Sequence, residues 1–210
     1  MIISEKYKFI FIVVPKTATS SIEKALGKYG SVIVDRAADG KHKAANEVRK
    51  EMGEEVWNQY FKFSFVRNPL SWTASWYNFR SRDELKNKDS QNHSNYTGNM
   101  TFEEFIKSDD WVVAGDGQSS WVTDDEGKVI VDYIGKFENL QNDFDEVCSR
   151  IGIPRIKLPS VNISRNSKAD QSYTDELRGI VKTRLSKDFR LFEYSANYKV
   201  DRLKGRTFWS

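Results

Sequence analysis

The chain has 210 residues, of which 39% are apolar and 13% aromatic, enough for the core of one ordinary domain. This composition excludes a disordered, collagen-like or coiled-coil protein. The 33 basic and 30 acidic side chains leave a formal net charge of +3, which argues against a dedicated duplex-DNA binder and still allows a small basic pocket for an anion.

Residues that bind metals or form disulfides are scarce in this sequence. The single cysteine, Cys148, excludes an intramolecular disulfide, and with only His42 and His93 we expect no metal site. No apolar run approaches the ~18 residues of a membrane span. The first apolar run, residues 9–14, is too short for a signal peptide. We therefore expect a cytoplasmic protein without a membrane span.

Strand and helix patterns alternate in the first part of the chain. Residues 7–14 are a run of β-branched and aromatic side chains, which predicts a strand buried on both faces. A helix is expected next, with Ser20 and Glu23 spaced as a capping box. Residues 31–34 predict a short second strand, and residues 44–58 predict one or two helical pieces interrupted at a glycine.

The middle of the chain repeats the strand-to-helix pattern. Residues 60–66 alternate aromatic and polar side chains, as a strand does, and lead into Asn68 and Pro69, a favourable N-cap and first helical residue. The polar stretch 84–100 lacks periodicity, which predicts a mobile surface loop. A short helix is expected over residues 101–107.

The last third completes the alternation. Residues 124–127 are typical of a turn, residues 128–137 are expected to be extended, and an apolar stripe predicts a helix over residues 140–151. A last helix is expected to start near Thr174. Strands alternating with helices predict one α/β domain over residues 1–210, with three layers and a mainly parallel central sheet flanked by helices.

The segment most typical of a binding site is residues 15–21, Pro-Lys-Thr-Ala-Thr-Ser-Ser, between the first strand and its helix. A strand-to-helix turn directs backbone N–H groups at one point, where the helix dipole favours an anion. Lys16 and the hydroxyl groups add donors there. The spacing is not that of a Walker A loop. The alternative is an ordinary well-capped helix with Lys16 in solvent.

A second strand-to-helix junction carries Arg67, and Ser75 lies two helical turns further along. The guanidinium group is a forked donor suited to a phosphate. Alternatively, Arg67 pairs with a surface carboxylate and Ser75 only allows close helix packing. Two junctions of this kind in one small domain favour an anionic ligand.

Both segments resemble those of sulfotransferases that use 3′-phosphoadenosine 5′-phosphosulfate (PAPS). Residues 15–21 resemble the 5′-phosphosulfate loop, and Phe65-Val66-Arg67-Asn68-Pro69 with Ser75 resembles the 3′-phosphate element. The likeness continues in Phe137-Glu138-Asn139-Leu140 with Asp143-Phe144, Leu158-Pro159 with Asn162, and Asp188-Phe189 with Phe192 and Tyr194. It spans about residues 8–195 and is closest to the carbohydrate sulfotransferase, or family 2, branch.

The resemblance implies a P-loop-like fold, PAPS as sulfuryl donor, 3′-phosphoadenosine 5′-phosphate (PAP) as product, and no required metal. Lys16 would contact the phosphosulfate and stabilise charge on the leaving oxygen. The residues implied in donor binding are Lys16, Thr17, Ala18, Thr19, Ser20, Ser21, Arg67, Ser75 and Arg165. Thr19 replaces a frequent glycine. Trp72 replaces a frequent basic residue, which suggests a different cofactor or acceptor contact.

The acceptor hydroxyl must lose a proton, and His42 is the expected base because an unperturbed histidine titrates near pH 6.5. Its Lys-His-x-Ala-Ala context resembles the histidine stretch of the same branch. Alternatively, His42 is a surface or helix-capping residue, and Glu23, Asp35 or Asp39 is the base. Residues expected on the acceptor side, unless they are core packing groups, are Trp111, Gln118 and Trp121.

The sequence therefore predicts in-line sulfuryl transfer to the hydroxyl of a sugar or a hydroxylated small molecule, with no nucleic-acid partner. Two alternatives stay open. One is a nucleotide-dependent, kinase-like P-loop enzyme, disfavoured because neither a Walker A loop nor an evident acidic Mg²⁺ ligand is present. The other is a non-catalytic module that binds a nucleotide or glycan.

Overall fold

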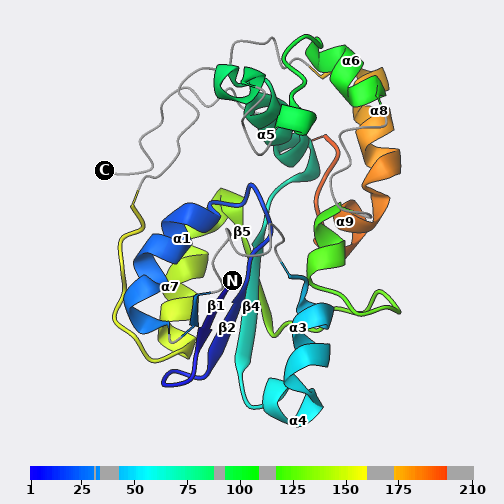
Figure 1. Cartoon of the computed structure of the whole chain (residues 1–210). Coiled ribbons are helices and arrows are strands. Elements are labelled where there is room, and N and C mark those ends of the chain that lie inside the picture. The colour runs from blue at the N-terminus through cyan, green and yellow to red at the C-terminus, as the bar shows by residue number, and fades with distance from the viewer. Residues whose placement is uncertain (31, 34–42, 88–92, 109–116, 160–172, 198–210) are drawn as a thin grey trace. The chain divides into compact units, whose positions relative to one another are not determined.

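The computed structural model describes residues 1–30, 32–33, 43–87, 93–108, 117–159 and 173–197 (Figure 1). The chain divides into two compact units, each assembled from two separate segments. The first unit comprises residues 1–67 and 114–162, and the second comprises residues 68–113 and 163–210.

The first unit is built on a five-stranded sheet with the order β3-β1-β2-β4-β5. Its strands are β1 (Ile2–Ser4), β2 (Phe9–Ile12), β3 (Val32–Ile33), β4 (Phe61–Val66) and β5 (Tyr133–Lys136). The three strands β2, β4 and β5 are parallel, whereas β1 is antiparallel to both of its neighbours. The expected α/β class with a mostly parallel, helix-flanked sheet is confirmed. The antiparallel β1 was not predicted.

The two central strands explain the stability of this sheet. All four residues of β2 are buried, as the continuous apolar run predicted, and Phe11 stacks on Phe63 of β4 with ring centroids 5.2 Å apart. The Ser64 hydroxyl donates a hydrogen bond of 2.8 Å to the Ile12 carbonyl, which joins the two strands near their carboxyl ends. This edge of the sheet is therefore held in a fixed register.

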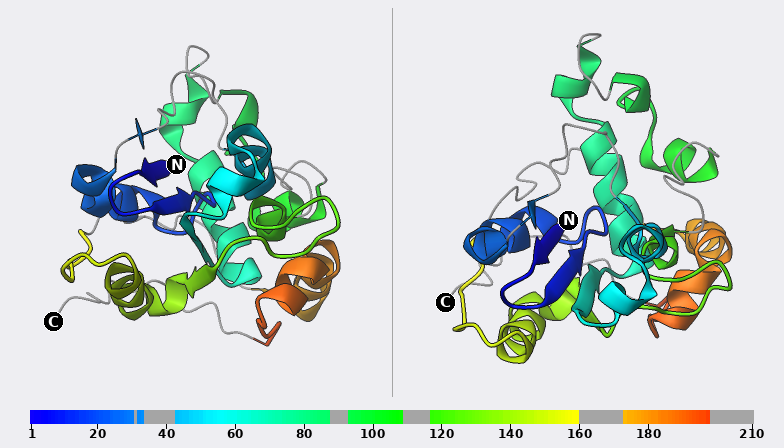
Figure 2. Two further views of the ribbon diagram at one scale, coloured as in Figure 1. Left: turned by 90° about the horizontal axis from the view of Figure 1, so that it is seen from below. Right: turned by 60° about the horizontal axis from the view of Figure 1, so that its bottom comes forward.

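Helices cover both faces of the sheet. They are α1 (Thr19–Leu26), α3 (Ala45–Met52), α4 (Glu54–Trp57) and α7 (Leu140–Arg150), with 3-10 turns η1 (Gly27–Tyr29), η4 (Gly117–Trp121) and η5 (Phe137–Asn139). Figures 1 and 2 show α1 and α7 on one face, and α3 and α4 on the other. Gly53, at φ 79°, separates α3 from α4 and accounts for the predicted interruption.

The connections make β2 and β4 the central pair of the fold. From β2 the chain passes through α1 to β3, at one edge of the sheet, and returns through α3 and α4 to β4, on the other side of β2. Ligands of open α/β sheets bind beyond the carboxyl ends of strands where the order reverses in this way.

The second unit is helical and has its own core. Its elements are α5 (Pro69–Arg80), α6 (Phe102–Lys107), α8 (Asp175–Arg184), α9 (Ser186–Leu191) and the 3-10 turns η2 (Asp83–Lys86) and η3 (His93–Asn95). Asn68 caps α5 by accepting from the Leu70 amide, as predicted. The segment 84–100, predicted to lack regular structure, contains the η2 and η3 turns.

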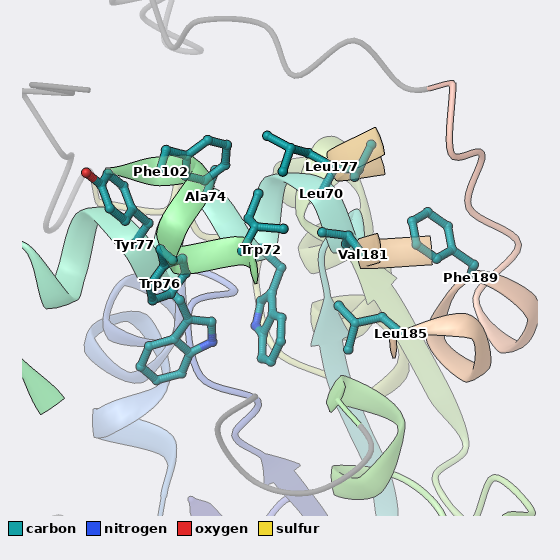
Figure 3. Packing of buried hydrophobic residues seen from close by; sticks show 12 residues of the cluster. Leu70, Trp72, Ala74, Trp76, Tyr77, Phe102, Leu177, Val181, Leu185 and Phe189 are labelled. Carbon is teal, nitrogen blue, oxygen red and sulfur yellow. The ribbon is translucent and has the colours of Figure 1, made fainter. Parts of the chain in front are cut away.

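Aromatic and aliphatic side chains from α5, α6, α8 and α9 form this core (Figure 3). Trp72 lies in it fully buried, with its ring edge-on to Trp76 at 5.9 Å between centroids. The Trp72 side chain, at the position where a basic residue is frequent, is therefore used for packing within this unit. Of the similar C-terminal motif, Asp188, Phe189 and Phe192 are also buried.

None of the helices described is long and apolar enough to cross a membrane.

Candidate functional site

The loop between β2 and α1 has an unusual backbone. Lys16 and Ala18 both adopt left-handed conformations, with φ of 69° and 64°. Each such residue costs about 1–2 kcal/mol relative to a right-handed one, and residues of this kind cluster at ligand clamps. When consecutive residues alternate between left-handed and right-handed conformations, their backbone N–H groups point to the same side. These N–H groups form a concavity that binds anions.

Thr17 holds this loop from within. Its side chain is fully buried, and its hydroxyl donates a hydrogen bond of 2.8 Å to the carbonyl of Val14. The bond closes the turn immediately after β2 and supports the left-handed residues on either side. Thr17 therefore contributes loop shape through its side chain, and its expected contact with a ligand would come from its backbone.

The start of α1 differs from the prediction. The N-cap is Ala18 and not Ser20, and the capping box of Ser20 and Glu23 is wrong because the helix already begins at Thr19. The Ala18 carbonyl accepts from the amides of Ser21 and Ile22, at 3.0 and 3.2 Å. Alanine has no side-chain acceptor for the N–H groups of the first helical turn. The N–H groups that precede the first intrahelical hydrogen bonds point out of the end of the helix.

Thr19 itself sits in the helix and is not one of the residues with positive φ. A β-branched side chain is compatible with that conformation. The glycine that is frequent in the similar loops is therefore not required at this position of this chain.

The parallel pairing brings Arg67 to the same edge of the sheet as this loop. Ile12 of β2 is in register with Ser64 of β4, so both chains leave the sheet at the same edge a few residues later. The Arg67 side chain is 7% exposed, and its guanidinium carbon lies 4.2 Å from the ring centroid of Phe137. This contact is a cation–π interaction that holds the plane of the donor fork.

Gln118 holds the backbone of Arg67. Its side-chain Oε1 accepts from the Arg67 N–H at 2.8 Å, and its Nε2 donates to the Arg67 carbonyl at 2.7 Å. Gln118 is fully buried, so the expectation that it faces the acceptor is corrected: its amide is used to pair with Arg67. Trp121, from the same η4 turn, is also buried.

The remaining residues predicted for the site do not all belong to the described part of the first unit. Ser75 is half-buried on α5, in the second unit, and Glu23 lies on α1. Five of the candidates fall outside the described residues: His42, Arg165, Asp35, Asp39 and Trp111. The described chain resumes at Lys43, whose ammonium group pairs with Glu51 at 2.7 Å, just before α3.

The start of α3 is tied to the turn over residues 124–127. Asp125 accepts hydrogen bonds of 2.7 Å from both Asn46 and Lys50, and these bonds lower the pKa of its carboxyl group. The expected turn is present, with the Gly127 amide donating to the Asp124 carbonyl. The segment that follows residue 42 is therefore anchored to the first unit at a defined point.

The described residues of the first unit therefore offer an anion two kinds of donor at one sheet edge: the start of α1, whose N-cap Ala18 makes no side-chain hydrogen bond, beside Lys16, and the guanidinium group of Arg67. Among these residues no group of three or more His, Cys, Asp or Glu side chains could hold a metal ion. The arrangement is chemically suited to a ligand with two separated anionic groups.

Sequence reasoning did not identify the roles of Gln118 and Phe137. Gln118 is 51 residues from Arg67 in the chain, and no local pattern connects them. Phe137 belongs to the Phe-Glu-Asn-Leu motif that carried the resemblance, so the motif marked the position without indicating that its ring contacts Arg67.

Comparison with known proteins gives two matches. The family model described as the sulfotransferase family matches residues 1–195 of this chain. A protein of Archaeoglobus fulgidus, itself described as uncharacterized, is 30% identical over 127 residues, which is 60% of this chain and 92% of that protein. No solved structure matches the chain at a significant level.

Proposed function

Because the chain belongs to the sulfotransferase family, we propose that it transfers a sulfuryl group from PAPS to the hydroxyl of a sugar or a hydroxylated small molecule. The observation that carries this proposal is the pairing of two anion-ready junctions at one sheet edge: the left-handed loop with Lys16, and Arg67 stacked on Phe137. PAPS presents two separated anionic groups, the 5′-phosphosulfate and the 3′-phosphate, which match these two junctions.

In the proposed reaction, the acceptor oxygen forms a bond to sulfur while the bond from sulfur to the bridging phosphate oxygen breaks, and PAP leaves with the electron pair. Lys16 and the first-turn amides of α1 stabilise the charge that develops on the bridging oxygen. Thr17, Ala18, Thr19, Ser20 and Ser21 hold the same group. The in-line geometry is provided by positioning of the two substrates.

The 3′-phosphate is assigned to Arg67, with Ser75 and Arg165 as further donors. The assignment of Arg67 has the support of its burial and its stacked guanidinium group. Ser75 and Arg165 are assigned from the resemblance alone, since Ser75 belongs to the other unit and Arg165 lies outside the described residues.

We assign removal of the proton from the acceptor hydroxyl to His42. This assignment also follows from the resemblance, and its support from the structure is indirect. The described chain resumes at Lys43, and α3, which is anchored through Asp125, begins at Ala45, three residues after position 42. General-base assistance of this kind contributes ~10²–10⁴-fold to rates.

We further propose that both units belong to one sulfotransferase domain with a P-loop-like sheet. The family match over residues 1–195 includes segments of both units, and β2, its loop and α1 follow the order of a phosphate-binding strand–loop–helix.

The proposed function is tested first by ligand binding. PAP at 100 times its Kd is expected to stabilise the folded protein by about 2.7 kcal/mol and to raise its melting temperature, whereas ATP with Mg²⁺ should have little effect. Transfer of radiolabelled sulfate from PAPS to a panel of sugars and hydroxylated metabolites then identifies the acceptor class. Stabilisation by ATP with Mg²⁺ but not by PAP would overturn the proposal in favour of a kinase-like enzyme.

A further inference from the structure

Arg67 is the first residue beyond the paired part of β4. The registers of the neighbouring strands end before it, at Ile12↔Ser64 on one side and Val66↔Lys136 on the other. Its backbone direction is therefore not set by the sheet ladders. A rotation of about 10° at its Cα displaces a guanidinium group by about 1 Å, enough to weaken a positioned contact.

The side chain of Gln118 takes the place of a strand at this position. Its two hydrogen bonds, of 2.8 and 2.7 Å, engage both the N–H and the carbonyl of Arg67. A primary amide presents one donor and one acceptor side by side, which is the pattern that a neighbouring strand offers to a peptide group. Holding both groups of one residue restricts its φ and ψ together.

Gln118 is itself well fixed. It is fully buried in η4, a turn that begins at Gly117 with φ of 87°, where a glycine is favoured. Side chains close the turn, since the Ser120 hydroxyl donates to the Gly117 carbonyl at 2.7 Å and the Thr123 hydroxyl donates to the Ser119 carbonyl at 3.0 Å. The amide that pairs with Arg67 therefore belongs to a rigid support.

The other end of the Arg67 side chain rests on Phe137, so the residue is held at its backbone and at its guanidinium group by two different segments. We infer that Gln118 is a positioning residue for recognition of the 3′-phosphate of the donor: it fixes the backbone from which Arg67 projects. This inference rests on the proposed function, because it requires that Arg67 binds that phosphate.

The test measures how strongly the full-length protein prefers PAP over adenosine 5′-monophosphate, which lacks the 3′-phosphate, by titration calorimetry. Gln118→Met keeps the size of the side chain and removes both hydrogen bonds. We expect it to weaken PAP binding about 10-fold and to leave binding of the monophosphate unchanged, because only the former uses Arg67. In an Arg67→Ala background, Gln118→Met should have no further effect on PAP.

A matched control is available in the same unit. Gln141 also pairs its side-chain amide with backbone groups, accepting from the Leu158 N–H and donating to the Ile156 carbonyl, both at 3.0 Å. Gln141→Met should lower the melting temperature without changing the preference for PAP. Gln141 is half-buried, and this control separates loss of a side-chain amide pair in general from loss of the one that holds Arg67.

Three results would overturn the inference. Failure of the wild type to prefer PAP would overturn the proposed function together with it. The inference alone would be overturned if the wild type prefers PAP and this preference is lost in Arg67→Ala but retained in Gln118→Met. It would also be overturned if Gln118→Met weakens PAP binding equally with and without Arg67. If Gln118→Met does not fold, Gln118→Asn, whose amide is one methylene too short to bridge both backbone groups, is judged by the same criteria.

Discussion

Replacing Thr17 by valine tests whether the loop after β2 is held in shape by a single hydroxyl. Valine has nearly the same size, so the main change is loss of the bond to the Val14 carbonyl. Thr17 and Val14 are essentially inaccessible to solvent. The Val14 carbonyl therefore loses this partner in the protein interior, at a cost of about 1–3 kcal/mol of stability. With a urea m-value of about 2–3 kcal/mol/M, the midpoint of unfolding should fall by roughly 0.3–1.5 M.

The same substitution should weaken ligand binding. The bond from Thr17 spans the turn that contains Lys16 and is followed by Ala18, both at positive φ. Without it the loop can relax to less strained conformations that do not present their N–H groups together. We expect PAP affinity, measured by calorimetry, to fall about 10-fold, equivalent to about 1.4 kcal/mol.

Two variants serve as controls for Thr17→Val. Thr17→Ser keeps the hydroxyl and removes one buried methyl group, so it should lose about 1 kcal/mol of stability and retain PAP affinity. Thr73→Val removes another buried hydroxyl, which donates to the Pro69 carbonyl at 2.9 Å within α5, and should not change PAP affinity. If Thr17→Val binds PAP as tightly as Thr17→Ser does, the hydroxyl does not shape the loop and the reasoning fails.

Three further predictions concern the chemistry and the buried thiol. Lys16→Ala should lower kcat by at least ~10²-fold and weaken PAP binding less, because the cation is needed more in the transition state; near-normal turnover would exclude this role. His42→Ala should lower kcat by ~10²–10⁴-fold and remove the rise of rate with pH, whereas a lower melting temperature with unchanged turnover would indicate a helix cap. Burial raises the pKa of the Cys148 thiol, so the folded chain keeps its proton to higher pH than the unfolded chain. The unfolding free energy should therefore fall as pH rises above the ordinary cysteine range, and thiol reagents should label Cys148 only in denaturant; rapid labelling of the native protein would contradict its burial.

The elements predicted correctly are those with strong local signals. The apolar run of β2, the Asn68 cap of α5 and the glycine break after α3 each depend on residues that are neighbours in sequence. The β1 strand escaped prediction because three residues are too few to show a period, and it is stabilised by pairing with β2 and β3.

The candidate site was predictable in its residue types and not in its geometry. The positions of Lys16 and Arg67 follow from strand-to-helix junctions, which are local. The start of α1 was misplaced because a capping box is only a spacing pattern, whereas the left-handed conformation of Ala18 is set by the loop as a whole. The pairing of Gln118 with Arg67 depends on tertiary structure, which no local periodicity encodes.

The discontinuous second unit has a consequence for synthesis on the ribosome. The face of α5 that carries Trp72 packs against Leu177, Val181 and Leu185 of the C-terminal helices. At 5–20 residues per second, translation of the roughly 100 intervening residues takes about 5–20 s. The nascent chain therefore displays an incompletely covered aromatic surface for that period, and of the described helices that form this core α6 is the one that emerges early enough to shield part of it. A chaperone that holds nascent chains should accordingly associate with this protein after α5 emerges and leave once α8 is complete.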